Sequence, residues 1–392
     1  MQKIKRRIYL DHAATTYLDD KVVKAMAPYW TKEFGNPSSL YSDGANAKKA
    51  IESARARIAK VLNAKSSEII FTAGGTESVN LAIFGVVRNH LAHNKNKPHI
   101  ICSAIEHHAV LESFAALKGE GVEVTIVPVG QDGLVKAFDI AKAIRRNTVL
   151  VSVMYANNEI GTIQPIAEIS KTIKKINPKI LFHSDACQAA GALPLDVNKL
   201  GVDLLTINGS KIYGPKQIGL LYIRQGLQLK PIIYGGGQEN SLRSGTENVP
   251  AIIGFAEALE IAEKNIQKEN KRLTVLRDYF IKQAFKTIPN LVLNGDAIKR
   301  LANNINFSVL DAEGEALMLY LDAKGIEIST GSACTSTSMD ASHVITAIGR
   351  SETDAKSAIR ISLGRQTTKQ DLDFTLKTMI PIIKQLRTVS QL

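Results

Sequence analysis

Short apolar runs rich in β-branched residues alternate with longer helical patterns from Ser66 to Leu221, and this alternation constrains the fold most strongly. Seven runs are predicted to be strands: Glu68–Thr72, His99–Ser103, Val122–Val127, Thr148–Val153, Ile180–Ser184, Leu204–Ile207 and Gly219–Arg224. Those after the first are almost continuously apolar, which is typical of strands covered by helices on both faces. The sequence therefore predicts an α/β unit with a mostly parallel seven-stranded sheet. Ligands bind beyond the carboxyl ends of such strands, so the residues that follow each run are candidates for chemistry.

A second pattern begins near Pro250, where apolar residues recur at helical spacing across Ala251–Ile288 and predict a long helix between two domains. Shorter predicted strands and helices follow and indicate a smaller α+β unit. It contains Thr330–Ser342, a stretch of small and polar residues around Cys334 that is typical of a mobile loop. We therefore expect a large domain over residues 15–260, and a small domain formed by residues 1–14 and 261–392.

Composition narrows the class of protein. The chain has 392 residues, of which 45% are hydrophobic and 22% charged, as in ordinary globular proteins. No uncharged apolar run approaches the roughly 18 residues of a membrane span, so we expect a cytoplasmic protein that does not bind membranes. The formal net charge of +12 is spread along the chain, without the interleaved aromatic residues of a nucleic-acid surface, and no direct nucleic-acid partner is expected.

The chain contains three cysteines, Cys102, Cys187 and Cys334. An odd number at wide spacing argues against a disulfide framework and against a structural zinc site, and no metal is predicted. Cys102 lies in a predicted buried strand and Cys187 close to a predicted site, so both are interpreted as structural. On its own, Cys334 is equally compatible with a reactive thiol and with a small loop residue.

Two groups of residues at predicted strand ends suggest a cofactor site. Ala73–Ser78 joins a strand to a helix through two glycines, which suits a phosphate at the helix N-terminus, although a plain helix cap explains the same residues. Asp185 and Lys211 follow two further strands. A lysine, a carboxylate and a phosphate cradle are the groups that pyridoxal phosphate requires, whereas a structural salt bridge remains the alternative for this pair.

The whole chain resembles a cysteine desulfurase of the NifS/IscS-like group. Members of this group are pyridoxal-phosphate enzymes of fold type I. Ten motifs occur in the family's order and carry the resemblance. They are Tyr9-Leu10-Asp11 with Ala14-Thr15-Thr16, Phe34-Gly35-Asn36-Pro37, Gly75-Thr76-Glu77-Ser78, Glu106-His107, Asn157-Asn158-Glu159-Ile160-Gly161, Asp185-Ala186-Cys187-Gln188, Lys211-Ile212-Tyr213-Gly214-Pro215-Lys216, Arg243-Ser244-Gly245-Thr246, Gly331-Ser332-Ala333-Cys334-Thr335-Ser336 and Arg360-Ile361-Ser362-Leu363-Gly364-Arg365.

The resemblance implies a role for each matching residue in cofactor binding. Lys211 would hold pyridoxal phosphate as a Schiff base, Asp185 would pair with the ring nitrogen, and His107 would stack on the ring. Gln188 and Asn158 would hydrogen-bond the ring hydroxyl oxygen. Residues at the phosphate would be Gly75, Thr76, Ser210 and Asn208 of the same chain, with Thr246 from the other subunit of a homodimer.

The resemblance also implies the substrate and the reaction. Arg360, Asn36 and Asn158 would bind the carboxylate of L-cysteine. Lys211 would remove the α-proton, His107 would help to move protons, and Cys334 would attack the substrate sulfur. The products would be L-alanine and a persulfide on Cys334, whose sulfur would pass to a scaffold for iron–sulfur clusters or to a tRNA-thiolation enzyme.

Three positions depart from the family pattern. Family members usually have histidine directly before the lysine and serine two residues further back, where this chain has Ser210 and Asn208. Both residues can still donate hydrogen bonds, so we expect weakened phosphate binding. Gln217 replaces a glycine that is common after the Gly-Pro-Lys turn.

Two alternative functions remain at this point. A selenocysteine lyase or another class-V pyridoxal-phosphate enzyme would use Lys211 and Asp185 equally, and only the loop cysteine argues for sulfur. A catalytically weak scaffold for sulfur transfer is the alternative from a different class, supported by Ser210 and Asn208. Bound cofactor that responds to cysteine would argue against the scaffold.

Overall fold

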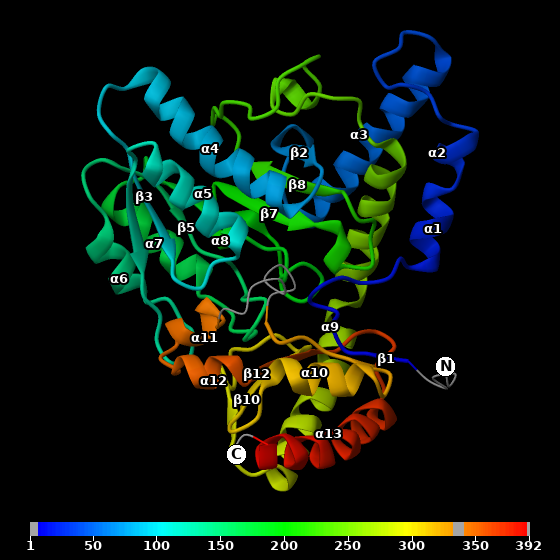
Figure 1. Ribbon diagram of the computed structural model, residues 1–392. Coiled ribbons are helices and arrows are strands. Elements are labelled where there is room, and N and C mark those ends of the chain that lie inside the picture. The colour runs from blue at the N-terminus through cyan, green and yellow to red at the C-terminus, as the bar shows by residue number, and fades with distance from the viewer. Residues whose placement is uncertain (1–6, 332–340, 390–392) are drawn as a thin grey trace.

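In the computed structural model, residues 7–331 and 341–389 are described. Their main feature is a seven-stranded sheet in the order β2-β8-β7-β6-β5-β3-β4 (Figure 1). Its strands are β2 (Ile69–Thr72), β3 (His99–Ser103), β4 (Glu123–Val127), β5 (Thr148–Ser152), β6 (Leu181–Asp185), β7 (Leu204–Asn208) and β8 (Gly219–Ile223). The pairs among β3 to β7 are parallel, whereas β8 is antiparallel to both of its neighbours. The predicted mostly parallel sheet is confirmed.

Both faces of this sheet are buried except at the edge strand β4, where Ile126 is 54% exposed. Successive strand residues point to opposite faces and belong to two different cores. In β2, Ile69 and Phe71 belong to one core and Ile70 to the other. One face is covered by α3 (Ser42–Leu62), α7 (Ile166–Ile176) and the first part of α9, the other by α4 (Gly75–His93) and α5 (His108–Gly119). This double burial explains the continuous apolar runs in the sequence.

A second, smaller layer carries its own core. It contains the antiparallel sheet β12-β10-β9 and the parallel pair β1–β11. Its elements are β1 (Ile8–Tyr9), β9 (Leu291–Leu293), β10 (Asn304–Val309), β11 (Ile326–Glu327), β12 (Ala358–Ser362), α10 (Gly314–Asp322) and α13 (Lys369–Val389). The α+β unit expected after the long helix is therefore present.

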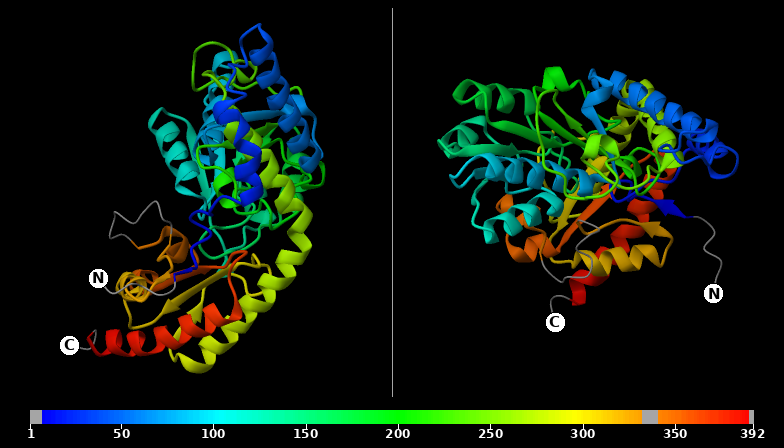
Figure 2. Two further views of the ribbon diagram at one scale, coloured as in Figure 1. Left: turned by 90° about the vertical axis from the view of Figure 1, so that its right-hand side faces the viewer. Right: turned by 90° about the horizontal axis from the view of Figure 1, so that it is seen from above.

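One helix, α9 (Val249–Thr287), joins the two layers (Figure 2). Its first half contributes residues such as Phe255 to the core of the large sheet, and its second half contributes residues such as Phe280 to the smaller core. The predicted boundary at residue 260 falls within this helix, and the division into two domains stays a prediction.

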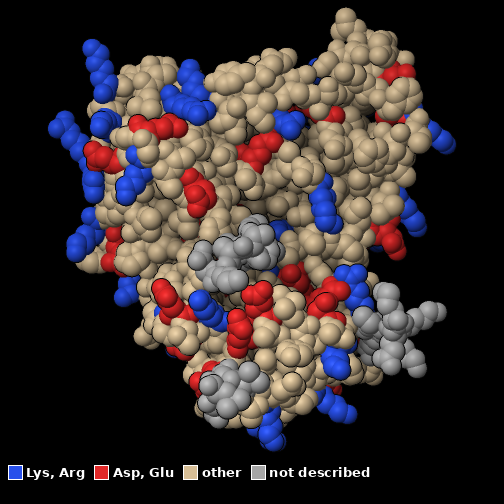
Figure 3. Space-filling view, viewed as in Figure 1, with Lys and Arg blue, Asp and Glu red and all other residues tan. Residues whose placement is uncertain are grey.

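Shorter helices complete the described chain. They are α1 (Asp20–Met26), α2 (Pro28–Thr31), α6 (Ala137–Ala143), α8 (Val197–Leu200), α11 (His343–Ala347), α12 (Glu352–Lys356), η1 (Ser66–Glu68), η2 (Gly209–Lys211) and η3 (Glu239–Ser241). None of the helices in residues 7–331 and 341–389 combines the length and apolarity needed to cross a membrane. Lysines and arginines are interspersed with acidic residues over the face seen in Figure 3, in keeping with a diffuse charge excess.

Candidate active site

A pocket of about 170 Å³ lies at the carboxyl ends of the central strands. Nine of the residues predicted from the sequence line it: Gly75, Thr76, His107, Asn158, Asp185, Gln188, Asn208, Lys211 and Arg360. They come from the ends of five strands of the large sheet and from β12 of the smaller one. The parallel strands bring these segments to one edge, which is why residues far apart in sequence meet here.

Three predicted residues that the structure describes do not line this pocket. The side chain of exposed Asn36 accepts a hydrogen bond from the Ser38 backbone N–H at 2.9 Å, so it caps its own turn. Ser210 donates its hydroxyl to Asn208 Oδ1 at 3.3 Å, and Thr246 is exposed. Cys334 lies outside the described residues. The roles predicted for these four stay predictions.

The carboxylate of Asp185 is held at the end of β6, where only 6% of the residue is exposed. Its Oδ1 accepts a hydrogen bond from the Cys187 backbone N–H at 2.9 Å, which fixes the side chain. Lys211 ends the short helix η2 after β7, and its Nζ donates to the carbonyl oxygen of Ala14. A fixed carboxylate and a lysine amine thus share one pocket.

The start of α4 forms a bare backbone surface in the same pocket. Gly74 has φ of +145°, which favours glycine, and the first helical N–H groups have no intrahelical acceptors. A Cβ on Gly75 would lie 2.8 Å from Cys187 Sγ, so a larger residue there would require the Cys187 side chain to shift. This combination leaves room and donors for an anion at the positive end of the helix dipole.

His107 caps the N-terminus of α5. Its Nδ1 accepts a hydrogen bond from the Ala109 backbone N–H at 3.1 Å. Since an acceptor nitrogen must carry a lone pair, the neutral ring has its proton on Nε2. His107 can therefore donate a hydrogen bond from Nε2–H into the pocket without losing its helix cap.

Glu106, next to His107, is a buried carboxyl group to which the sequence assigned no role. Its Oε1 accepts hydrogen bonds from Ser103 Oγ at 2.5 Å and from the Met154 backbone N–H at 2.8 Å. Its Oε2 has no hydrogen-bond partner in the described part of the chain. Burial first, with a smaller contribution from the Asp185 carboxylate, raises the pKa of Glu106 to about 8.

Cys187 and Cys102 are poor candidates for a nucleophile. Burial raises the pKa of both thiols well above its ordinary value, and neighbouring carboxylates, Asp185 for Cys187 and Glu106 for Cys102, raise it further. A reactive thiol needs the opposite environment, because the thiolate is the nucleophile. The structural role predicted for these two cysteines is consistent with their surroundings.

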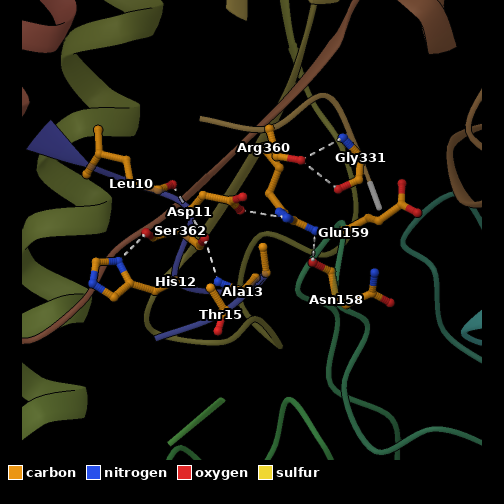
Figure 4. A network of polar contacts seen from close by, with 12 residues as sticks. Leu10, Asp11, His12, Ala13, Thr15, Asn158, Glu159, Gly331, Arg360 and Ser362 are labelled. Atoms are coloured by element: carbon orange, nitrogen blue, oxygen red, sulfur yellow. Dashed lines mark hydrogen bonds and ion pairs between the residues drawn. The ribbon is translucent and has the colours of Figure 1, made fainter. Parts of the chain in front are cut away.

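Arg360 reaches the pocket from β12 and is only 1% exposed (Figure 4). Its Nη2 lies 2.7 Å from Asp11 Oδ1, and its Nη1 donates to the Asn158 backbone oxygen at 3.1 Å. Its Nε has no hydrogen-bond partner among the described residues. Asp11 belongs to one of the family motifs, but nothing local in the sequence indicates its contact with a residue 349 positions away.

Comparison with known proteins places this chain in a family. The aminotransferase class-V family matches residues 8–374. A cysteine desulfurase IscS from Dictyoglomus turgidum is 51% identical over 387 residues, covering 99% of this chain and 97% of that protein. A cysteine desulfurase IscS from Methanosarcina thermophila is 48% identical and covers 99% of this chain and 94% of its own.

Solved structures agree with the sequence relatives. A NifS-like protein superimposes with a TM-score of 0.91 at 37% identity, covering 97% of this chain and all 100% of that one. SspA in complex with cysteine gives a TM-score of 0.79 at 36% identity, with coverage of 91% and 98%. The pocket, the fold and these full-length similarities lead to one conclusion: the chain belongs to the class-V aminotransferase family, among relatives named cysteine desulfurase.

Proposed function

We propose that this protein is a pyridoxal-phosphate-dependent cysteine desulfurase, which converts L-cysteine to L-alanine and passes the sulfur on as a persulfide. The observation that carries the proposal is the shared pocket of Lys211, Asp185, His107 and Arg360. Such a pocket can hold a cofactor and an amino-acid carboxylate together. The full-length similarity to proteins named cysteine desulfurase supports the same substrate.

The pocket residues fit pyridoxal phosphate. The glycine-lined start of α4 offers N–H donors to the phosphate, and fixed Asp185 offers a carboxylate to the ring nitrogen. Lys211 provides the amine to which the cofactor would attach, while Gln188 and Asn158 provide polar groups in the pocket lining. When bound, the cofactor would stabilise the negative charge that develops at the substrate Cα.

The chain's own groups would handle substrate and protons. Arg360 would bind the substrate carboxylate through its Nε–H, which has no acceptor in the described part of the chain. Lys211 Nζ, held near the carbonyl of Ala14, would accept the α-proton once it is free of the cofactor. His107 would orient a reacting group by donating a hydrogen bond from Nε2–H, because its Nδ1 is engaged as the helix cap.

Cys334 is proposed as the nucleophile, although it lies outside the described residues. The proposal rests on the family motif and on the unsuitable surroundings of Cys102 and Cys187. The Cys334 thiolate would attack the substrate sulfur, the sulfur–Cβ bond would break, and its electron pair would take up a proton to give alanine. The persulfide would then be available to an iron–sulfur scaffold or a tRNA-thiolation enzyme.

We also propose that the protein acts as a homodimer in the cytoplasm. Large apolar side chains are exposed along residues 30–41 and at 234; they are Trp30, Phe34, Leu40, Tyr41 and Tyr234. A second copy would cover such a surface. Thr246 is exposed and outside its own pocket, which suits a residue that reaches the phosphate of the partner subunit.

The test is release of sulfide and alanine from L-cysteine by the cofactor-loaded protein with a thiol reductant. We expect equimolar products from the wild type and from Cys102→Ala, a control that removes a buried cysteine. Cys334→Ala should keep the cofactor spectrum and its response to cysteine but release no sulfide. Lys211→Ala should lose the spectral signature of the covalently attached cofactor.

Other outcomes would reject parts of the proposal. Sulfide release by Cys334→Ala would overturn the assigned nucleophile. Bound cofactor without either product would leave a different class-V substrate, with selenocysteine the first to assay. Failure to bind any cofactor would favour a sulfur-transfer scaffold, for which the departures at Ser210 and Asn208 are the supporting observation.

A further inference from the structure

The guanidinium of Arg360 is a buried charge that the fold must neutralise. Its side chain is 1% exposed, and the acidic group paired with it is Asp11, whose side chain is 16% exposed. A buried, unpaired charge is strongly destabilising, so this ion pair allows Arg360 to occupy the pocket before any substrate arrives. Asp11 is thus tied to the residue that we propose binds the substrate carboxylate.

The backbone around Asp11 is held against β12, so the carboxylate has a defined position. Ser362 donates its N–H to the Leu10 carbonyl at 2.7 Å and its Oγ accepts from the Ala13 N–H at 2.9 Å. The carbonyl of Asp11 accepts from Tyr9 Oη at 2.9 Å and from the Ala14 N–H at 3.1 Å. These bonds fix the segment on both sides of Asp11 (Figure 4).

The guanidinium is held at both terminal nitrogens. Nη2 pairs with the Asp11 carboxylate and Nη1 with the Asn158 carbonyl, while Nε has no acceptor among the described residues. A buried donor without an acceptor is costly, and a carboxylate arriving in the pocket would satisfy it. Donors that are oriented in advance bind more tightly, because little side-chain entropy remains to be lost.

We propose that Asp11 is a positioning residue for substrate recognition: it fixes the Arg360 guanidinium so that Nε–H is directed to the substrate carboxylate. This inference rests on the proposed function. Asp11 acts through Arg360 and does not itself touch the substrate. Its effect should therefore depend on the presence of a carboxylate in the ligand.

The experiment measures equilibrium binding of L-alanine and of L-alanine methyl ester to the cofactor-loaded protein by calorimetry. The ester lacks the carboxylate charge and serves as the ligand control. In Asp11→Ala, we expect the dissociation constant of L-alanine to rise about tenfold or more, the size of one charged hydrogen bond, and that of the ester to change less than about twofold. Asp11→Asn keeps an oxygen acceptor for Nη2 and should remain within about threefold of the wild type.

Two further variants separate positioning from general damage. Asp11→Glu keeps the charge but displaces the carboxylate by one methylene, so it should weaken binding of L-alanine but not of the ester. It provides the test if Asp11→Ala fails to fold. Asp19→Ala removes a more exposed ion pair, with Arg365 at 2.6 Å, whose two residues do not line the pocket, and it should leave both ligands unaffected. Equal weakening of both ligands, or no weakening of L-alanine, in Asp11→Glu would overturn the inference.

Sulfide release is measured in parallel and separates this inference from the proposed function. We expect the KM for L-cysteine to rise in Asp11→Ala, with a smaller change in kcat. Suppose that the wild type releases no sulfide, and that Asp11→Ala still weakens binding of L-alanine but not of the ester. This result would reject the desulfurase proposal and support the role of Asp11.

Discussion

Glu106 shows how one buried residue links stability to pH. Its carboxyl group is buried, with one oxygen bonded to Ser103 and Met154 and the other without a partner in the described chain. Its pKa of about 8 means that the folded protein keeps a proton which the unfolded chain, with an ordinary pKa of 4.5, releases. Because the folded state then binds more protons, the free energy of unfolding should fall as pH rises from about 4.5 to about 8.

Glu106→Gln tests this dependence. Glutamine is neutral at every pH and its oxygen can still accept from Ser103 and Met154, so the variant should lose this part of the pH dependence, a slope of up to about 1.4 kcal/mol per pH unit. Urea unfolding from about pH 5 to about pH 9 measures it. Ser103→Ala is the control: it should lower stability but keep the slope. Parallel curves for Glu106→Gln and the wild type would contradict the assignment.

At the scale of elements, the turn that leads into β8 contains Gln217, a departure from the family pattern for which the sequence offered no interpretation. Gln217 stands where relatives of this kind commonly have glycine, and it adopts φ of 58°, in the left-handed region. That conformation costs a side chain about 1–2 kcal/mol. Gln217 is exposed, so its side chain recovers little of this cost through packing.

Gln217→Gly should therefore stabilise the protein. Relief of the left-handed strain outweighs the extra backbone entropy of glycine in the unfolded chain, and we expect a gain of about 0.5–1 kcal/mol. Lys216→Gly is the matched control, because Lys216 is exposed, adjacent and has no positive φ. It should destabilise by a similar amount. Denaturant unfolding measures both, and a loss of stability in Gln217→Gly would contradict the strain argument.

At the scale of the whole molecule, the large sheet and the smaller layer have separate cores, and apolar side chains remain exposed on one segment. The large sheet is covered on both faces and α9 joins it to the smaller core. The segment from α2 to the start of α3 lies at the end of the molecule away from α10 and α13 (Figure 1). Leu40 is fully exposed at 101%. A second copy seated here would bury it.

Leu40→Asp should convert the proposed dimer to a monomer. Each subunit would lose one buried leucine and gain a buried charge, which weakens association by at least about 100-fold. Sedimentation velocity measures the change, and cofactor retention should fall with it if Thr246 acts across the interface. Leu319→Asp, on exposed α10, is the control and should remain a dimer. An unchanged sedimentation coefficient for Leu40→Asp would place the interface elsewhere.

The amino-acid sequence by itself determined the strands of the central sheet and most residues of the pocket. Strand positions could be predicted because apolar periodicity is a local property. Two predicted site residues, Asp185 and Asn208, are the last residues of β6 and β7. The ordered motifs likewise indicated the family, because each motif is a short run of neighbouring residues. Lys211, His107 and Arg360 were found in this way, and all three line the pocket.

Only the tertiary structure decided how distant groups pair. The contact between Asp11 and Arg360 spans 349 positions. The Glu106 oxygen that has no partner within residues 7–331 and 341–389 follows from burial that no local pattern encodes. The left-handed backbone at Gln217 was likewise visible only in three dimensions. Local propensity and periodicity act over a few residues, whereas ion pairs, desolvation and strain depend on which segments the folded chain brings together. The sequence therefore named the residues of the site, and the fold determined their partners.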